Sequence, residues 1–255
     1  MLIKRIRIIT VIAAVCFATA MLTQPAYAYQ KETKMNEQFL NAVTKGDVAK
    51  VKEMLRADPA LAQARDQKGV SAILKATYNG KKEVAAEILA TGVQLNIFEA
   101  AATGQTERVK TLIKQDVSLV NAFSPDGFMP LGLAVFFGHG DTVEALLAAG
   151  AEVNTASRES MKVTPLHSAA AARQTAIAKV LIDHGADVNS SQAESGFTPL
   201  HEAALNGDIE LARLLLERGA KINAKMTDGK TPLVFALESR QSEMAKFLEE
   251  RGGVK

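Results

Sequence analysis

Small and large apolar residues recur along this chain in a nearly regular order. A pair of mostly alanine residues comes just before a glycine, and a pair of larger apolar residues follows in the next helix-sized segment. The small pairs are Ala42/Val43, Ala76/Thr77, Ala100/Ala101, Ala134/Val135, Ala169/Ala170, Ala203/Ala204 and Ala236/Leu237. The larger pairs are Met54/Leu55, Ile88/Leu89, Leu112/Ile113, Leu146/Leu147, Leu181/Ile182 and Leu215/Leu216. This order predicts two short helices per unit, and its recurrence predicts stacked units in place of one globular core.

The glycines give the register of the units. With two exchanges for arginine, they stand at Gly46, Gly80, Gly104, Gly138, Arg173, Gly207 and Arg240. The steps between them are 34, 24, 34, 35, 34 and 33 residues. We therefore expect seven helix pairs from about residue 36 to residue 253. The step of 24 leaves no room for a hairpin between the second and third pairs.

A short motif marks the start of the first helix in three units. It reads Thr164-Pro165-Leu166-His167, then Thr198-Pro199-Leu200-His201, then Thr231-Pro232-Leu233. Proline loses no hydrogen bond in a first helical turn, and the threonine before it is a natural N-cap. Three units end in a common tail, which in the sixth reads Leu215-Leu216-Glu217-Arg218-Gly219-Ala220-Lys221-Ile222-Asn223. The glycine of this tail should close its helix in the left-handed conformation.

On these motifs and their spacing, the chain resembles the ankyrin repeat family over nearly all of residues 36–255. The resemblance implies an all-α fold, an ankyrin repeat solenoid of about seven helix-turn-helix repeats with short β-hairpin fingers. We expect one domain without an internal linker, after a loose polar lead-in at residues 29–35. In the seventh repeat, Arg240 and Glu249 replace a glycine and an apolar residue, which predicts a polar terminal cap.

Residues 1–28 have the pattern of a signal peptide. Lys4, Arg5 and Arg7 form a basic start, residues 8–22 are mostly apolar, and Ala26-Tyr27-Ala28 is a small-residue cleavage site. A transmembrane anchor is the alternative, but the apolar stretch is short for a span and a cleavage site follows it directly. We therefore expect cleavage after Ala28 and no stable membrane insertion afterwards. The short, alanine-rich leader indicates a bacterial protein of the periplasm or the exterior.

Removing the leader changes the charge and cysteine content. The leader holds three of the 30 basic residues and none of the 28 acidic ones, so the remaining chain has 27 against 28, a net charge of −1. A nearly neutral protein is a poor candidate for binding nucleic acid, which needs a basic face. The one cysteine, Cys16, also lies in the leader, so the remainder needs no disulfide.

The sequence offers little for catalysis or for a metal. His167 and His201 occupy the same position in successive repeats, without an evident third ligand for zinc. The resemblance implies a structural hydrogen-bonding role for both histidines. No nucleophile elbow and no phosphate-binding glycine loop appears. We therefore expect no enzyme activity, no cofactor and no metal.

Proteins of the ankyrin repeat family usually bind partners through hairpin tips and the exposed face of the first helices, which together form a concave groove. This resemblance places the partner-binding positions at Tyr78, Asn79, Phe128, Phe136, Phe137, Met161, Val163, Phe197, Leu205 and Asn206. Four phenylalanines between residues 128 and 197 fall in this set, although aromatic residues are only 5% of the chain. Exposed apolar clusters mark protein contacts. The alternative is that some rings fold back into the joint between hairpin and helix, Phe136 first among them.

Three function classes remain open. The first is a secreted or periplasmic module that binds a protein partner through the concave groove. The second is a structural scaffold that associates with itself. The third is an enzyme or a small-ligand binder, which would need a deep pocket with convergent polar groups. The first agrees best with the repeats and the placement of the phenylalanines.

Overall fold

The computed structural model describes residues 33–159 and 161–255. The predicted signal peptide, residues 1–28, lies outside the described residues. The chain divides into two compact units between Val93 and Gln94, and we describe each by itself. The sequence predicted one repeat domain without an internal linker over residues 36–255. The division falls in the connection that the step of 24 residues makes too short for a hairpin.

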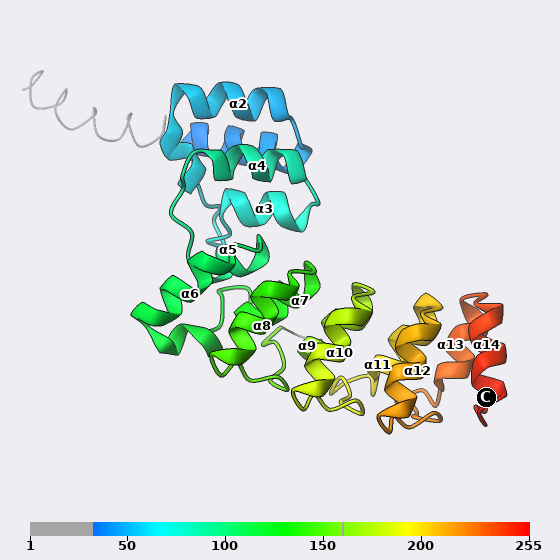
Figure 1. The fold of residues 1–255 in the computed structure, drawn as a ribbon. Helices are drawn as coiled ribbons and strands as arrows, with labels where there is room; N and C mark the ends of the chain where they lie inside the picture. Colours follow the sequence, from blue (N-terminus) through cyan, green and yellow to red (C-terminus); the bar gives the residue numbers. More distant parts are fainter. Residues whose placement is uncertain (1–32, 160) are drawn as a thin grey trace, which may run out of the picture. The chain divides into compact units, whose positions relative to one another are not determined.

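Unit 1 holds the first two helix pairs. A helix over residues 33–45 is already formed at residues 33–35, which we expected to be a loose lead-in. The apolar residues Phe39, Leu40 and Val43 of this helix are buried, so the helix buries one apolar face. The further elements, coloured blue to cyan in Figure 1, are α2 (Val48–Ala57), the 3-10 helix η1 (Pro59–Gln63), α3 (Ala72–Tyr78) and α4 (Lys82–Ala90).

Unit 2 holds five helix pairs that follow one another in chain order (Figure 1). Each second helix packs on the first helix of its own pair, and successive first helices pack on each other. The all-α stack of helix pairs expected from the sequence is confirmed. The elements are α5 (Ile97–Ala102), α6 (Thr106–Gln115), the 3-10 helix η2 (Val117–Asn121), α7 (Pro130–Phe136), α8 (Gly140–Ala148), α9 (Pro165–Ala171), α10 (Thr175–Asp183), α11 (Pro199–Asn206), α12 (Ile209–Glu217), α13 (Pro232–Glu238) and α14 (Ser242–Glu249).

The fingers between repeats are tight turns and not β-hairpins. Within residues 33–159 and 161–255 they contain no named strand and only one isolated bridge, between Arg65 and Ser71. Each finger is nevertheless closed by a backbone hydrogen bond, such as Ser124 N to Phe128 O at 2.9 Å. Each finger is a single turn in place of the expected β-hairpin, because too few residues flank the turn to form two strands.

The core follows the small and the larger apolar positions that recur in every repeat, which we call the alanine column and the larger column. The alanine column is fully buried, which lets neighbouring first helices approach closely, at Ala100, Ala134, Ala169, Ala203 and Ala236. The larger column is fully buried in most second helices, at Ile88, Leu146, Leu181, Leu215 and Leu248. In α6 the expected core residues Leu112 and Ile113 are only half-buried, and Val109 takes the enclosed position. No repeat could bury these side chains alone, so the stack is the folding unit.

A ladder of asparagine side chains joins successive repeats in unit 2. The amide of Asn189 donates to Gly219 O at 3.0 Å, and its oxygen accepts from Lys221 N at 2.8 Å. The same pair of bonds is made by Asn121, Asn154 and Asn223 to the repeat that follows each of them. Each asparagine thus satisfies a carbonyl at a helix end and an amide beyond it. This explains why the tail of the repeat ends in asparagine.

The helix starts follow the sequence with two differences. Thr164 and Thr198 cap α9 and α11 as expected, but the Thr231 hydroxyl donates to Val254 O instead of capping α13. Before α5 the threonine-proline motif is missing, and a capping box takes its place. There Asn96 accepts from Glu99 N at 2.9 Å, and Glu99 accepts from Asn96 N at 2.9 Å. The reciprocal bonds let α5 begin directly after a short connection.

The turn between the helices of a pair is left-handed even where glycine is absent. Arg173 and Arg240 have φ values of 56° and 57° at the positions that glycine occupies elsewhere. A Cβ on Gly138 would lie 2.6 Å from Gln174 Nε2 of the next repeat. In the repeat that follows Arg173, the residue equivalent to Gln174 is Asp208, whose side chain is shorter. At Gly138, a larger residue would therefore have to adopt a positive φ and also displace the Gln174 side chain.

Replacing Gly219 by alanine is expected to lower the free energy of unfolding by about 1 kcal/mol. Gly219 ends its helix with a φ of 89°, as the sequence predicted, and a Cβ there would meet nothing within 4 Å. The effect should therefore come from the backbone conformation alone. Urea unfolding of both proteins, followed by circular dichroism, measures it. An unchanged midpoint would show that the left-handed conformation is not strained by alanine.

Amide exchange is expected to be faster at residues 91–97 than at residues 220–230. The first segment has no finger, whereas the second is held by Lys221 N to Asn189 Oδ1 at 2.8 Å and by Thr227 N to Ser195 O at 2.9 Å. Hydrogen exchange read by mass spectrometry compares the two segments directly. Equal protection of both would contradict this prediction.

Candidate functional site

Three of the predicted partner-binding residues are large apolar side chains that lie exposed on unit 2. Phe136 ends α7 and is 48% exposed, Met161 lies on the finger before α9 and is 60% exposed, and Leu205 near the end of α11 is 36% exposed. They come from repeats four, five and six. We call these three residues the apolar strip. Exposed apolar side chains of this size on three successive repeats indicate a binding surface.

Four other predicted residues are half-buried around the strip: Phe128, Phe137, Val163 and Asn206. The Phe137 ring meets the Phe136 ring edge-on, with centroids 5.2 Å apart. Phe128 is held by its backbone, because its N–H donates to Ser124 Oγ at 3.0 Å. Ala171 and Ala172 occupy the places of Phe136 and Phe137 in the next repeat.

Phe197 belongs to the joint between finger and helix and not to the exposed strip. Its ring stacks on His201 with centroids 5.4 Å apart and meets Phe235 edge-on at 5.4 Å. Our expectation that Phe136 would be the first ring to fold back was wrong. Phe136 is the most exposed of the four phenylalanines, and Phe197 is the one that packs inward.

The two motif histidines have the structural role that was expected. The Thr164 hydroxyl lies 2.8 Å from His167 Nδ1, and His167 Nε2 lies 3.1 Å from Phe197 O. His201 makes the same contacts, to Thr198 and to Lys230 O. Burial lowers the pKa of both imidazoles, partly opposed by their bonds to these carbonyls. Neutral histidines therefore tie each helix start to the next finger.

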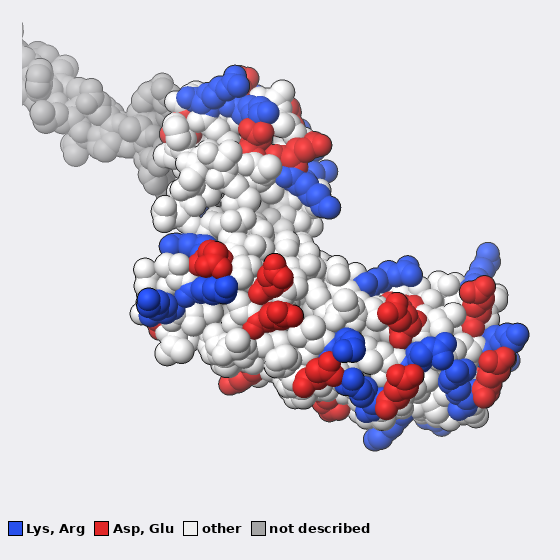
Figure 2. Space-filling view, viewed as in Figure 1, with Lys and Arg blue, Asp and Glu red and all other residues white. Residues whose placement is uncertain are grey.

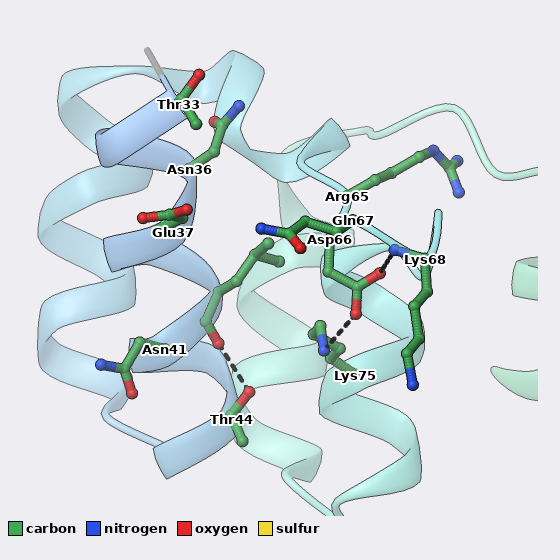
Figure 3. A pocket seen from close by; sticks show the side chains of 11 residues that line it. Thr33, Asn36, Glu37, Asn41, Thr44, Arg65, Asp66, Gln67, Lys68 and Lys75 are labelled. Atoms are coloured by element: carbon green, nitrogen blue, oxygen red, sulfur yellow. Dashed lines mark hydrogen bonds and ion pairs between the residues drawn. The ribbon is translucent and has the colours of Figure 1, made fainter. Parts of the chain in front are cut away.

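Unit 1 carries the remaining two predicted residues, at the end of α3. Tyr78 is 39% exposed, and Asn79 donates to Lys75 O at 2.7 Å. Neither lines the hollow of about 740 Å³ that opens between the helix over residues 33–45 and the finger at residues 65–68. Figure 3 shows its polar lining, in which Lys75 pairs with Asp66 at 2.7 Å.

The hollow in unit 1 is a poor small-ligand site. Burial alone would raise the pKa of Asp66, but Lys75 and the backbone N–H groups of Val70 and Lys68 outweigh it, so the pKa is lowered. These polar groups already satisfy one another. Most of the other lining side chains are exposed, including Glu37, Asn41 and Lys68. The hollow therefore resembles an open protein-contact surface more than an enclosed pocket.

Charges of both signs alternate on the outer helices of unit 2. Figure 2 shows basic and acidic side chains interspersed over α10, α12 and α14 on the face in view. Asp183 pairs there with Arg218 at 2.7 Å and with Lys179 at 3.2 Å, which lowers the pKa of its carboxyl. Such exposed pairs contribute little stability. They leave no continuous basic strip on this face.

Two residues of functional interest were not predicted from the sequence. Glu202 lies half-buried on α11, one turn before Leu205, and burial raises the pKa of its carboxyl. Leu237, in the small-residue column of the last repeat, is 41% exposed. Position in the repeat register could have identified Leu237, which is larger than the equivalent Ala170 and Ala204, whereas the burial of Glu202 has no signal in the sequence.

The described residues hold neither a metal-ligand cluster nor a membrane-spanning helix. Within residues 33–159 and 161–255, no three histidine, cysteine, aspartate or glutamate side chains come together as metal ligands would. No helix in the same part of the chain has both the length and the apolar character that crossing a bilayer requires.

Comparison with known proteins agrees with the repeat architecture. The family model described as ankyrin repeats (3 copies) matches residues 97–192, 131–226 and 190–254, which is more than half of the chain. The mouse (Mus musculus) protein RelA-associated inhibitor is 35% identical over 102 residues, which are 39% of this chain and 12% of that protein. The chain thus spans a small part of that relative's length. With its repeat register, stacked helix pairs and family matches in agreement, the chain belongs to the ankyrin repeat family.

Proposed function

We propose that this protein is a non-catalytic binding module that acts in the periplasm or after secretion and binds a protein partner through the apolar strip of unit 2. The observation that carries the proposal is the exposure of Phe136, Met161 and Leu205 on three neighbouring repeats. Ankyrin repeats imply protein partners in general. The near-neutral charge of the chain without its leader makes nucleic acid a poor alternative partner.

Site-specific crosslinking tests the surface before the partner is known. A photoreactive phenylalanine derivative is placed at Phe136 or at Leu205 in the exported protein, and at Lys179 as the control. Lys179 is equally accessible but lies on the outer helix α10. We expect one discrete adduct from positions 136 and 205 and none from position 179. No adduct at the strip, or the same adducts at all three positions, would contradict the proposal.

Export of the protein follows from the leader. We expect the protein recovered from a bacterial periplasm to lack residues 1–28, because Ala26-Tyr27-Ala28 follows the apolar stretch directly. Its intact mass decides the matter. A mass that still includes the leader, or recovery in the membrane fraction only, would show that the leader is an anchor.

A self-associating scaffold is the second candidate, and Leu237 favours it. The equivalent residues Val135, Ala170 and Ala204 are fully buried, whereas Leu237 is 41% exposed. Val254, near the end of the chain, is also exposed, at 51%. A scaffold of this kind would form dimers that dissociate on dilution and that Leu237→Asp abolishes. Sedimentation velocity at several concentrations distinguishes this role from binding of a different protein.

A further inference from the structure

Glu202 is out of place on the partner-binding face. It is half-buried on α11, one helical turn before Leu205 and Asn206. The Asn206 amide donates to Glu202 Oε1 at 3.2 Å, but it is shared with Ala170 O at 3.4 Å. Among the described residues, no lysine or arginine forms an ion pair with this carboxylate. The free protein therefore holds a partly desolvated negative charge that only one amide compensates.

The surroundings of Glu202 suit the stem of a long basic side chain. Leu205 and the Phe197 ring are on the same repeat, and the half-buried Phe235 takes the equivalent position on α13, which packs against α11. The nearby cation Lys230 is already paired with Glu238 at 2.9 Å, with its ammonium 5.8 Å from the Phe235 ring. Aliphatic stems pack on such apolar surface while the charged head reaches a carboxylate.

We propose that Glu202 is a specificity residue of the binding face, which accepts a lysine or arginine side chain of the partner next to a bulky apolar side chain packed on Leu205. The inference rests on the proposed function, since it names the chemistry of the partner at the same surface. Because the site presents a carboxylate near apolar side chains, we expect its occupant to be a polypeptide segment with both basic and apolar residues. A partner without a basic residue would bury the carboxylate further and leave it unpaired.

The equivalent residues in other repeats support a specific role. The position holds Leu133 in repeat four, Ser168 in repeat five and Phe235 in repeat seven, and Glu99 of repeat three is used in the capping box of α5. The stacked fold therefore does not need a carboxylate at position 202. A neutral side chain should be tolerated equally well at position 202. We therefore expect Glu202→Gln and Glu202→Ser to unfold in urea at the same midpoint as the natural protein, or at a higher one, at pH 7.5.

A library of random twelve-residue peptides, displayed on phage, tests the inference with the whole exported protein as bait. We expect the natural protein to select peptides with lysine or arginine beside leucine, isoleucine or phenylalanine. Titration of a selected peptide should show about tenfold weaker affinity, or more, for Glu202→Gln and for Glu202→Ser. Glu217→Gln removes an exposed carboxylate from α12 of the same repeat and should leave the affinity unchanged. Glu202→Lys should select acidic peptides instead.

The outcomes separate this inference from the proposed function. Selected peptides without basic residues, or unchanged affinity for Glu202→Gln, would overturn the role of Glu202. If those peptides still bind more weakly to Phe136→Ala, the binding face itself stands. If the natural protein selects no peptide, both the inference and the proposed function are contradicted. A second neutral variant, Glu202→Ser, guards against an effect peculiar to glutamine.

Discussion

Replacing Phe197 by alanine is expected to lower the free energy of unfolding by about 2–3 kcal/mol. The ring packs on His201 and on Phe235 of the next repeat, with centroids 5.4 Å away in both cases. Its removal leaves a gap at the joint between two repeats, and the aromatic pairs are lost with it. Because Phe197 is half-buried and not fully enclosed, the effect should fall below the range of about 3–5 kcal/mol for phenylalanine in a core. The midpoint of urea unfolding measures it.

Phe136→Ala is the matched control, and it should behave in the opposite way. The ring is 48% exposed, so its truncation should change the free energy of unfolding by less than about 0.5 kcal/mol. If the apolar strip anchors a partner, the same variant should weaken binding by about 2 kcal/mol, which is roughly thirtyfold. A large loss of stability from Phe136→Ala would place this ring in the core. No change in stability from Phe197→Ala would remove that ring from the joint.

The repeated helix pairs could be predicted from the sequence because each column of equivalent residues has one structural role. Ala134 and Ala203 are buried where helices approach closely, and Leu146 and Leu215 are buried where the core needs volume. Because the register is fixed, the same assignment of small and large apolar positions recurs in every repeat, and each repeat supports it. The positive φ of Gly219 followed from the same register. Local propensity and long-range packing thus point to the same fold.

Features that depend on a neighbouring repeat were harder to predict. A motif within one repeat does not show that Gly138 faces Gln174, or that Asn189 bridges to Gly219 and Lys221. The capping box of Asn96 and Glu99 has its own sequence pattern, which differs from the threonine-proline motif of the later repeats. The lack of strands in the fingers reflects turn length, which the resemblance alone did not give.

The same dependence explains why the exposed phenylalanines were ranked wrongly. The repeat after Phe197 supplies Phe235, so that ring has an aromatic partner to pack on. The repeat after Phe136 supplies Ala171, which is too small to cover it. The exposure of each ring therefore depends on the residues of the following repeat, which the register of a single repeat does not show.

Acid is expected to destabilise unit 2 below about pH 6.5, through His167 and His201. Burial lowers the pKa of both imidazoles in the folded protein. Between the folded and unfolded pKa values, the unfolded chain binds more protons than the folded chain, so stability falls as the pH falls. The stabilising contribution is complete above the unfolded pKa. Each histidine adds a slope of at most about 1.4 kcal/mol per pH unit.

Urea unfolding at pH 7.5, 6.5 and 5.5, compared with a His167→Gln/His201→Gln variant, measures this slope. The raised pKa of Glu202 acts in the opposite sense, because the folded carboxyl keeps its proton above the unfolded value. Glu202 is present in both proteins. The difference between their slopes of unfolding free energy against pH therefore measures the contribution of the two histidines. We expect the variant to be less stable at pH 7.5, where it lacks the imidazole bonds to Phe197 O and Lys230 O. It should lose less stability than the natural protein on going to pH 5.5. Equal slopes for both proteins would mean that the two imidazoles accept protons in the folded repeats as readily as in the unfolded chain.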